Sequence, residues 1–448
     1  MTTFDALLPA LAELLKTEAA SLKPYLPILV NRDLNGRIRL IVDADHEASF
    51  QDNTDPQSLG LLAKTIHEKL APHVWQPDQI WLFEENIKEL IDATLAYPLA
   101  DSQSIGIDGV LVADRLAQEA TWASINPETS GVPRAVFYSI KGGVGRSTAL
   151  AATAWALAEA GKRVLVLDLD LESPGLSSSL LPEDRQPAYG ITDWLVEDLV
   201  GNGDAVIKDL FTRSPLSHDG DGDGEIIVVP AHGHDPGEYI SKLGRVWMPS
   251  FQVDGTRQMW SFRLARLLRE LEQTHQPDIV LIDSRAGIDE VASACVTDLG
   301  ANRIYLFALD GLQTWIGYRM LFQHWLQHGV AQQIREHIQL VGAMLPTWHD
   351  QPQQAAADLK EHSFNLFLET LYDEQPAAIN EIEDLYPFSF DIDDPDAPHN
   401  PLLIPWNQSF AAIQTHHARL EGIDSRLVEL VYDELIADLS ALLEGWAS

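Results

Sequence analysis

The chain has 448 residues, enough for two domains or one large elaborated domain, and its hydrophobic fraction of 46% is that of a folded globular protein. Its 67 acidic and 30 basic residues give a formal net charge of −37, which argues against non-specific binding to DNA and to anionic membranes, because both depend on Lys and Arg. A single cysteine, Cys295, excludes an internal disulfide framework, and without a signal-peptide pattern or an apolar run of about 20 residues the sequence predicts a cytoplasmic protein with no membrane segment.

The first 130 residues are expected to form an accessory α/β domain of unknown role. A turn at 33–36 precedes an apolar run that predicts a strand at 38–42. Helices are expected over residues 4–22, 59–70, 85–95 and 111–123, the first of them from apolar residues at three- and four-residue steps. The turn-rich segment 126–133 predicts the boundary to a second domain, residues 131–448.

The glycine-rich segment 139–148 stands between an apolar, strand-like run at 135–138 and an Ala-rich helical pattern at 149–160. This is the context of a phosphate-binding loop, in which backbone N–H groups and a helix N-terminus face an anion. Ser147 is placed where a hydroxyl can ligate Mg²⁺. A tight glycine turn without a ligand is the alternative for such a loop considered alone.

The loop resembles the deviant Walker A motif of the ParA/MinD family of ATPases, in which a first lysine, here Lys141, reaches the nucleotide of a dimer partner. One position departs from the family pattern, because the usual second lysine is Arg146, and the two residue types are not interchangeable. The resemblance implies ATP binding by Lys141, Gly142, Gly143, Val144, Gly145, Arg146, Ser147 and Thr148. It leaves open whether Arg146 slows hydrolysis.

Acidic residues follow two further apolar runs. Asp168 and Asp170 end a predicted strand at 164–167, and in the family the second acid, matching Asp170, helps to place the attacking water. An acidic cap at a solvated strand end is the alternative.

The segment 277–287 resembles the Walker B strand and its switch, with Asp283 in the Mg²⁺ shell beside Ser147. Arg285 departs from the family's switch sequence and is open to three interpretations: a contact to phosphate, a contact to a partner, or a surface ion pair.

The remaining elements extend this α/β pattern. Strands are expected at 226–231, 302–310 and 338–344, and helices at 262–271, 314–325 and 427–443. Residues 351–398 are expected to be an insertion, helical first and acidic later. The segment 402–407 resembles the family's last core strand and the turn near adenine, which implies a contact from Pro405. The polar segment 216–224 begins like a Ca²⁺ loop, but the twelfth position of that loop, which should be Glu, is Pro230, so an acidic loop is favoured over the alternative of a Ca²⁺ site.

The resemblance implies a P-loop NTPase fold, a doubly wound and mainly parallel α/β sheet, with ATP and Mg²⁺ at the carboxyl ends of the strands. We expect an ATP-dependent homodimer that acts as a hydrolytic switch on an unidentified protein partner. Lys141, Asp170 and Arg146 are the expected catalytic residues. The alternatives are a non-hydrolysing nucleotide-binding scaffold, in signalling or defence against phage, and a chromosome- or plasmid-partitioning ATPase, which the acidic charge disfavours.

Overall fold

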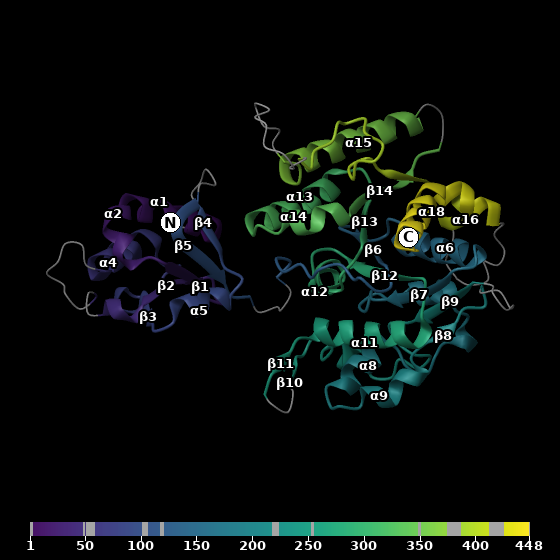
Figure 1. The fold of residues 1–448 in the computed structure, drawn as a ribbon, viewed down its shortest axis with the longest axis horizontal. Coiled ribbons are helices and arrows are strands. Elements are labelled where there is room, and N and C mark those ends of the chain that lie inside the picture. Colours follow the sequence, from purple (N-terminus) through teal and green to yellow (C-terminus); the bar gives the residue numbers. More distant parts are fainter. Residues whose placement is uncertain are drawn as a thin grey trace. The chain divides into compact units, whose positions relative to one another are not determined.

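The computed structural model shown in Figure 1 divides into two compact units, residues 1–123 with 327–329, and residues 124–326 with 330–448. The structure describes residues 3–47, 50, 59–100, 106–116, 121–216, 224–251, 255–347, 351–373, 387–411 and 425–447. Most of the expected acidic loop and residues 374–386 of the expected insertion therefore lie outside the described residues. No helix within the described ranges is long and apolar enough to cross a membrane.

The first unit is built on a mixed five-stranded sheet in the order β3-β2-β1-β5-β4. Its strands are β1 (Ile28–Arg32), β2 (Ile38–Asp43), β3 (Trp81–Glu84), β4 (Tyr97–Ala100) and β5 (Gly106–Asp114). Its helices are α1 (Phe4–Thr17), α2 (Ala19–Leu22), α4 (Leu59–Leu70) and α5 (Ile87–Asp92). Val30 and Leu40 pair across β1 and β2 and join the main core of the unit, whereas their neighbours Leu29 and Ile41 join a smaller cluster with Ile87, because side chains alternate between the two faces of a sheet.

Three of the four helices expected in this unit are confirmed by α1 with α2, by α4 and by α5. The helix expected at 111–123 is wrong, since residues 106–114 form β5. This strand pairs in parallel with β1 and antiparallel with β4. Val110 and Val112 are buried two residues apart, which is the period of a strand, and long-range pairing has overridden the local apolar pattern.

The second unit contains an eight-stranded sheet in the order β15-β14-β13-β6-β12-β7-β9-β8. Its strands are β6 (Arg134–Ser139), β7 (Arg163–Asp168), β8 (Thr212–Arg213), β9 (Glu225–Val229), β12 (Ile279–Ala286), β13 (Arg303–Ala308), β14 (Ile338–Leu345) and β15 (Leu402–Pro405). All neighbours pair in parallel except β8, which lies antiparallel at one edge. A short hairpin, β10 (Ser250–Phe251) and β11 (Arg257–Gln258), is separate.

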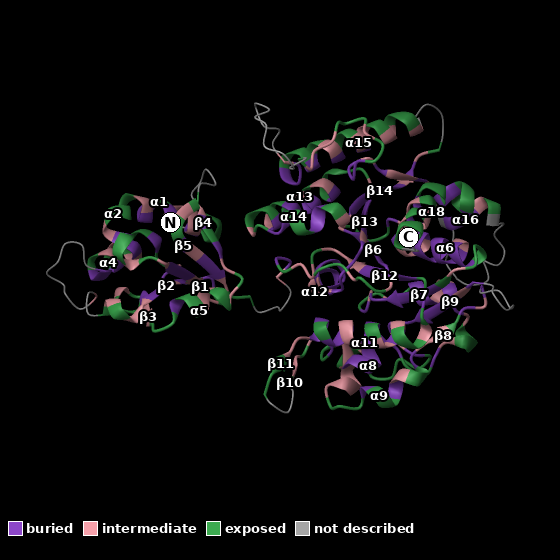
Figure 2. Ribbon diagram, viewed as in Figure 1, coloured by how far each residue is buried: buried purple, intermediate pink, exposed green. Residues whose placement is uncertain are grey.

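Helices cover both faces of this sheet. Figure 1 shows α6 and α18 on one side of β7 and β12, and α8 and α11 on the other. The helices are α6 (Arg146–Glu159), α7 (Leu176–Leu180), α8 (Ile191–Asp198), α9 (Gly203–Val206), α10 (Tyr239–Leu243), α11 (Trp260–His275), α12 (Glu290–Ser293), α13 (Leu312–Gln327), α14 (Ala331–Ile334), α15 (Gln351–Thr370), α16 (Gln408–Ala411) and α18 (Ser425–Ala447). Figure 2 marks the central strands as buried, which explains their continuous apolar sequences. The predicted doubly wound, mainly parallel α/β fold is confirmed.

Candidate functional site

The loop between β6 and α6 forms one wall of the candidate site. Gly143 and Gly145 have φ angles of +74° and +81°, in the left-handed region that glycine tolerates best. A Cβ atom added to Gly142 or Gly143 would meet nothing within 4 Å, so these glycines border open space. Helix α6 then begins at Arg146, three residues earlier than its Ala-rich pattern predicts. Its N-terminal end therefore lies at the loop and favours negative charge there.

A cavity of about 480 Å³ opens at this loop. It is lined by Ser139, Gly142, Gly143, Val144, Gly145, Arg146, Ser147, Thr148, Asp170, Ser173, Arg285 and Ala286. Three different strand ends, those of β6, β7 and β12, contribute to this lining. The predicted loop residues 142–148 and Asp170 are thus brought together, as expected for a ligand at the carboxyl ends of parallel strands.

A second, more apolar pocket of about 220 Å³ shares Gly143, Val144, Gly145 and Thr148 with the polar cavity. Its other lining residues are Met344, Ile404, Pro405, Trp406, Asn407, Phe410, Val431 and Tyr432. Pro405 therefore lines the pocket beside the loop, and its predicted contact with adenine remains a prediction. Met344, Phe410 and Tyr432 were not predicted, since apolar residues at the ends of a strand or within a helix carry no signal that separates pocket from core.

Asp168 is the last residue of β7, Asp283 lies within the neighbouring strand β12, and the two are direct partners in the parallel register. Both side chains are fully buried. Oδ2 of Asp168 accepts a hydrogen bond from the backbone N–H of Ser177. No donor among the described residues reaches Oδ2 of Asp283, although Oδ1 of that carboxylate is occupied.

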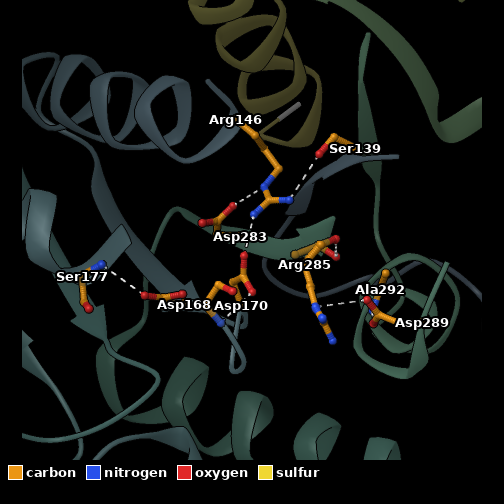
Figure 3. Close-up of polar contacts among 11 residues, drawn as sticks. Ser139, Arg146, Asp168, Asp170, Ser177, Asp283, Arg285, Asp289 and Ala292 are labelled. Atoms are coloured by element: carbon orange, nitrogen blue, oxygen red, sulfur yellow. Dashed lines mark hydrogen bonds and ion pairs between the residues drawn. The ribbon is translucent and has the colours of Figure 1, made fainter. Parts of the chain in front are cut away.

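Arg146 does not project freely into the cavity. Its Nε donates to Oδ1 of Asp283 at 2.7 Å, one terminal nitrogen donates to Asp170 at 3.3 Å, and the other donates to Oγ of Ser139 at 3.3 Å (Figure 3). The exposed fraction of the side chain is 7% for Arg146 and 1% for Asp283. We call Arg146, Asp283 and Asp170 the buried arginine cluster. The sequence identified all three residues but not their mutual contact, because nothing in a linear pattern shows which way an arginine turns.

The protonation of these groups follows from burial and from one another's charge. Burial lowers the pKa of Arg146, but the charges of Asp283 and Asp170 and their hydrogen bonds raise it above its usual value. Burial raises the pKa of Asp168 to about 7, and the charge of Asp283 adds to this effect. Burial also raises the pKa of Asp170, against the opposing charge of Arg146. Arg146 therefore stays charged, and it is the positive charge that offsets the neighbouring carboxyl groups of Asp170 and Asp283.

A second arginine lies at the rim of the same cavity. Arg285, near the end of β12, pairs with Glu172 at 2.6 Å and with Asp289 at 3.5 Å. The exposed fractions of the three side chains are 29%, 41% and 23% in that order. We call these residues the rim arginine cluster. Of the three interpretations open to Arg285, the ion pair is observed, and its side chain also lines the cavity.

Lys141 is exposed and lies outside the lining of both pockets. The chain therefore does not bring this predicted phosphate ligand to its own cavity. Ser147 does line the cavity, next to Arg146 in the first turn of α6. Its predicted role as a magnesium ligand remains a prediction.

Residues 135–393 match the family model described as the CobQ/CobB/MinD/ParA nucleotide binding domain. The match begins within β6 and covers the glycine loop, β7 with Asp168, Asp170 just after it, and β12 with Asp283. It amounts to more than half of the chain. No curated protein matches the sequence.

Solved structures of related architecture share little sequence with the chain. pNOB8 ParA bound to nonspecific DNA is 17% identical and covers 70% of this chain and 98% of its own, with a TM-score of 0.43. MinD from Pyrococcus horikoshii OT3, complexed with Mg-ADP, is 18% identical and covers 69% and 97%, with a TM-score of 0.40. Cobyrinic acid a,c-diamide synthase from Mycobacterium smegmatis, with an ATP analog and magnesium, is 20% identical and covers 51% and 82%, with a TM-score of 0.35. The expectation that nucleic acid is an unlikely partner gains no support from these comparisons.

Proposed function

Since the chain belongs to the CobQ/CobB/MinD/ParA nucleotide binding domain family, we propose that it binds ATP with Mg²⁺ and hydrolyses ATP as a dimerisation switch acting on a protein partner. The observation that carries the proposal is the pair of adjoining pockets, one polar and one apolar, that share the loop residues Gly143–Gly145 and Thr148. A nucleotide has the same division, with a flat apolar base at one end and phosphates at the other.

The base belongs in the apolar pocket and the phosphates in the polar cavity. Pro405 and Phe410 offer apolar contact to a base. The backbone N–H groups of residues 142–148 and the N-terminal end of α6 face the phosphates. The loop supplies this contact through its backbone, so the substitution of arginine for lysine at position 146 leaves it in place.

Ser147 and Asp283 are the residues that would hold a Mg²⁺ ion: Ser147 lines the cavity, whereas Asp283 is fully buried and lies outside that lining. Oδ2 of Asp283 is buried and has no donor among the described residues, which suits a carboxylate that awaits a cation. Hydroxyl and carboxylate oxygens are hard ligands of the kind that Mg²⁺ prefers. When bound, the ion neutralises charge on the phosphate oxygens. Arg146 holds the other oxygen of Asp283 and thereby fixes the orientation of the carboxylate.

Asp170 is the residue proposed to orient the attacking water. It lines the cavity, and its side chain is 16% exposed, so one face of the carboxylate remains accessible. Its Oδ2 accepts from Arg146 and its Oδ1 from the backbone N–H of Ser173, two contacts that hold it in place. A positioned carboxylate that accepts a hydrogen bond from water can direct its oxygen toward phosphorus.

Hydrolysis is tested by phosphate release from Mg-ATP. We expect wild type to release phosphate and Asp170→Ala to lose release while retaining nucleotide. Arg146→Lys is expected to release phosphate faster than wild type if the buried arginine cluster restrains Asp170 and Asp283. Undiminished release by Asp170→Ala would contradict the role given to this residue.

Dimerisation is tested by the molar mass of the protein. Lys141 is exposed and lies outside the lining of its own cavity, which supports the contact with a partner's nucleotide that the family resemblance implies. We expect static light scattering to show a doubled mass on titration with Mg-ATP and no such increase for Lys141→Ala. A constant mass in wild type at saturating Mg-ATP would contradict the dimer.

A non-hydrolysing nucleotide-binding scaffold is the second candidate, favoured by the contacts of Arg146 with both acids. It predicts nucleotide binding without phosphate release in wild type and recovery of release in Arg146→Lys. Signalling and defence against phage are the settings proposed for such a scaffold. The third candidate, a partitioning ATPase, predicts ATP-dependent and salt-sensitive binding to DNA, against which the net charge of −37 argues.

A further inference from the structure

We propose that Arg285 binds the terminal phosphate of the nucleotide and supplies there the positive charge that Arg146 commits to Asp283 and Asp170. This inference rests on the proposed function and adds a ligand-binding residue to the same site. Two arginines line the polar cavity, and they differ in what holds them.

The position of Arg285 points to the phosphate farthest from the base. The polar cavity and the apolar pocket share four loop residues, which mark the junction between phosphates and base. Arg285 and Asp170 belong to the eight lining residues of the polar cavity that do not line the apolar pocket; the others are Ser139, Gly142, Arg146, Ser147, Ser173 and Ala286. Arg285 therefore lies on the phosphate side of the site, in the same lining as Asp170, the residue proposed to orient the water that attacks the last phosphate.

A phosphate can replace the carboxylate partners of Arg285. Its carboxylate partners Glu172 and Asp289 are 41% and 23% exposed, so water screens both pairs. A phosphate presents more negative charge and can accept two parallel N–H bonds from one guanidinium. The nearly fully buried pair of Arg146 with Asp283 lacks this freedom, because separating it leaves a carboxylate without a partner in the protein interior.

The backbone beside Arg285 is already fixed next to the glycine loop. The N–H of Gly287 donates to the carbonyl of Ser139 at 2.9 Å, and the hydroxyl of Tyr138 donates to the carbonyl of Gly287 at 3.0 Å. These bonds tie the end of β12 to the end of β6, from which the loop starts. Only the side chain of Arg285 has to turn from its carboxylates to a phosphate (Figure 3).

The test compares equilibrium binding of Mg-ADP and of a magnesium-bound, non-hydrolysable ATP analogue to the full chain. Loss of a charge-assisted contact to the last phosphate should weaken the analogue about tenfold in Arg285→Ala and leave ADP within about twofold of wild type. Arg285→Lys should recover part of the loss, since it restores the charge without the planar fork. Arg319→Ala is the matched control, because Arg319 is a half-exposed arginine that pairs with Glu369 away from the cavity.

The variant Glu172→Gln distinguishes two roles of Arg285: binding a phosphate, or only holding Glu172 and Asp289 together. This variant releases Arg285 from its nearer carboxylate, so we expect analogue binding equal to or tighter than that of wild type. If Arg285 only tied Glu172 and Asp289 together, Glu172→Gln and Arg285→Ala would weaken both nucleotides alike, and the inference would be overturned. Unchanged analogue binding in Arg285→Ala would overturn it as well. Failure of wild type to bind either nucleotide would instead refute the proposed function, and this inference with it.

Discussion

The two arginine clusters at the cavity have the same composition, one guanidinium between two carboxylates, yet they differ in burial. Arg146 and Asp283 are 7% and 1% exposed, whereas Arg285 and Glu172 are 29% and 41% exposed. Water competes for every charge in the rim arginine cluster, whereas in the buried arginine cluster it reaches mainly Asp170, whose side chain is 16% exposed. Solvent access, more than residue type, therefore decides whether an ion pair is part of the framework or available to a ligand.

The strongest test of this difference is Arg146→Met, which keeps the apolar stem and removes the charge. Breaking a buried pair typically costs about 3–5 kcal/mol, because the remaining carboxylate is left uncompensated. We expect the free energy of unfolding, measured in urea without nucleotide or Mg²⁺, to fall by about this amount. Millimolar Mg²⁺ should restore part of the loss in this variant, since Asp283 then regains a counter-ion.

Arg285→Met is the matched control at the rim. An exposed pair contributes about 0–1 kcal/mol, so this change should lower the free energy of unfolding by no more than that. Equal losses in the two variants would show that burial does not separate the clusters.

The packing of helix α13 against the glycine loop can be tested by substitution. Helix α13 passes the loop at Gly317, where an added Cβ would lie 2.4 Å from Cγ2 of Ile140, the residue between Ser139 and Lys141. Gly317→Ala therefore forces the loop backbone or α13 to shift, at about 1–3 kcal/mol of stability. We expect nucleotide affinity to fall with it.

Gly445→Ala in α18 is the control for this substitution. Its added Cβ would meet nothing within 4 Å, so alanine should leave stability unchanged or raise it slightly. Unaltered nucleotide affinity in Gly317→Ala would show that α13 does not hold the loop in place.

The sequence was sufficient for the parts of this site that are local. The glycine loop, the acids carried by two apolar runs and the succession of strands along the chain follow from short patterns, and the family match and the mainly parallel sheet confirm the fold. The sequence did not predict β5, because its pairing with β1 joins residues about eighty positions apart in the chain. It also gave no sign that Arg146 turns to Asp283, because that contact depends on which strands become neighbours.

We expect the stability of the protein to depend on pH through Asp168, the register partner of Asp283. Burial raises the pKa of Asp168 to about 7, above the range of an unfolded aspartate, so the native state retains a proton that the unfolded state has released. The free energy of unfolding should therefore fall as pH rises from about 4 to about 7, by at most about 1.4 kcal/mol per pH unit. Asp168→Asn should flatten this slope in urea titrations with EDTA. Parallel curves for the two proteins would contradict the shift.

The smallest effect is expected at the rim. Glu172→Gln removes one charge from a pair that is screened on both sides, so the free energy of unfolding should change by less than about 1 kcal/mol, and by still less in high salt. Glu369→Gln, at the half-exposed pair with Arg319, is the reference for an ion pair outside the cavity. If the two changes cost equally little stability while only Glu172→Gln alters the affinity for the ATP analogue, then the rim pair affects ligand binding without supporting the fold. A loss of several kcal/mol in Glu172→Gln would place Arg285 in the framework beside Arg146, and the distinction between the two clusters would disappear.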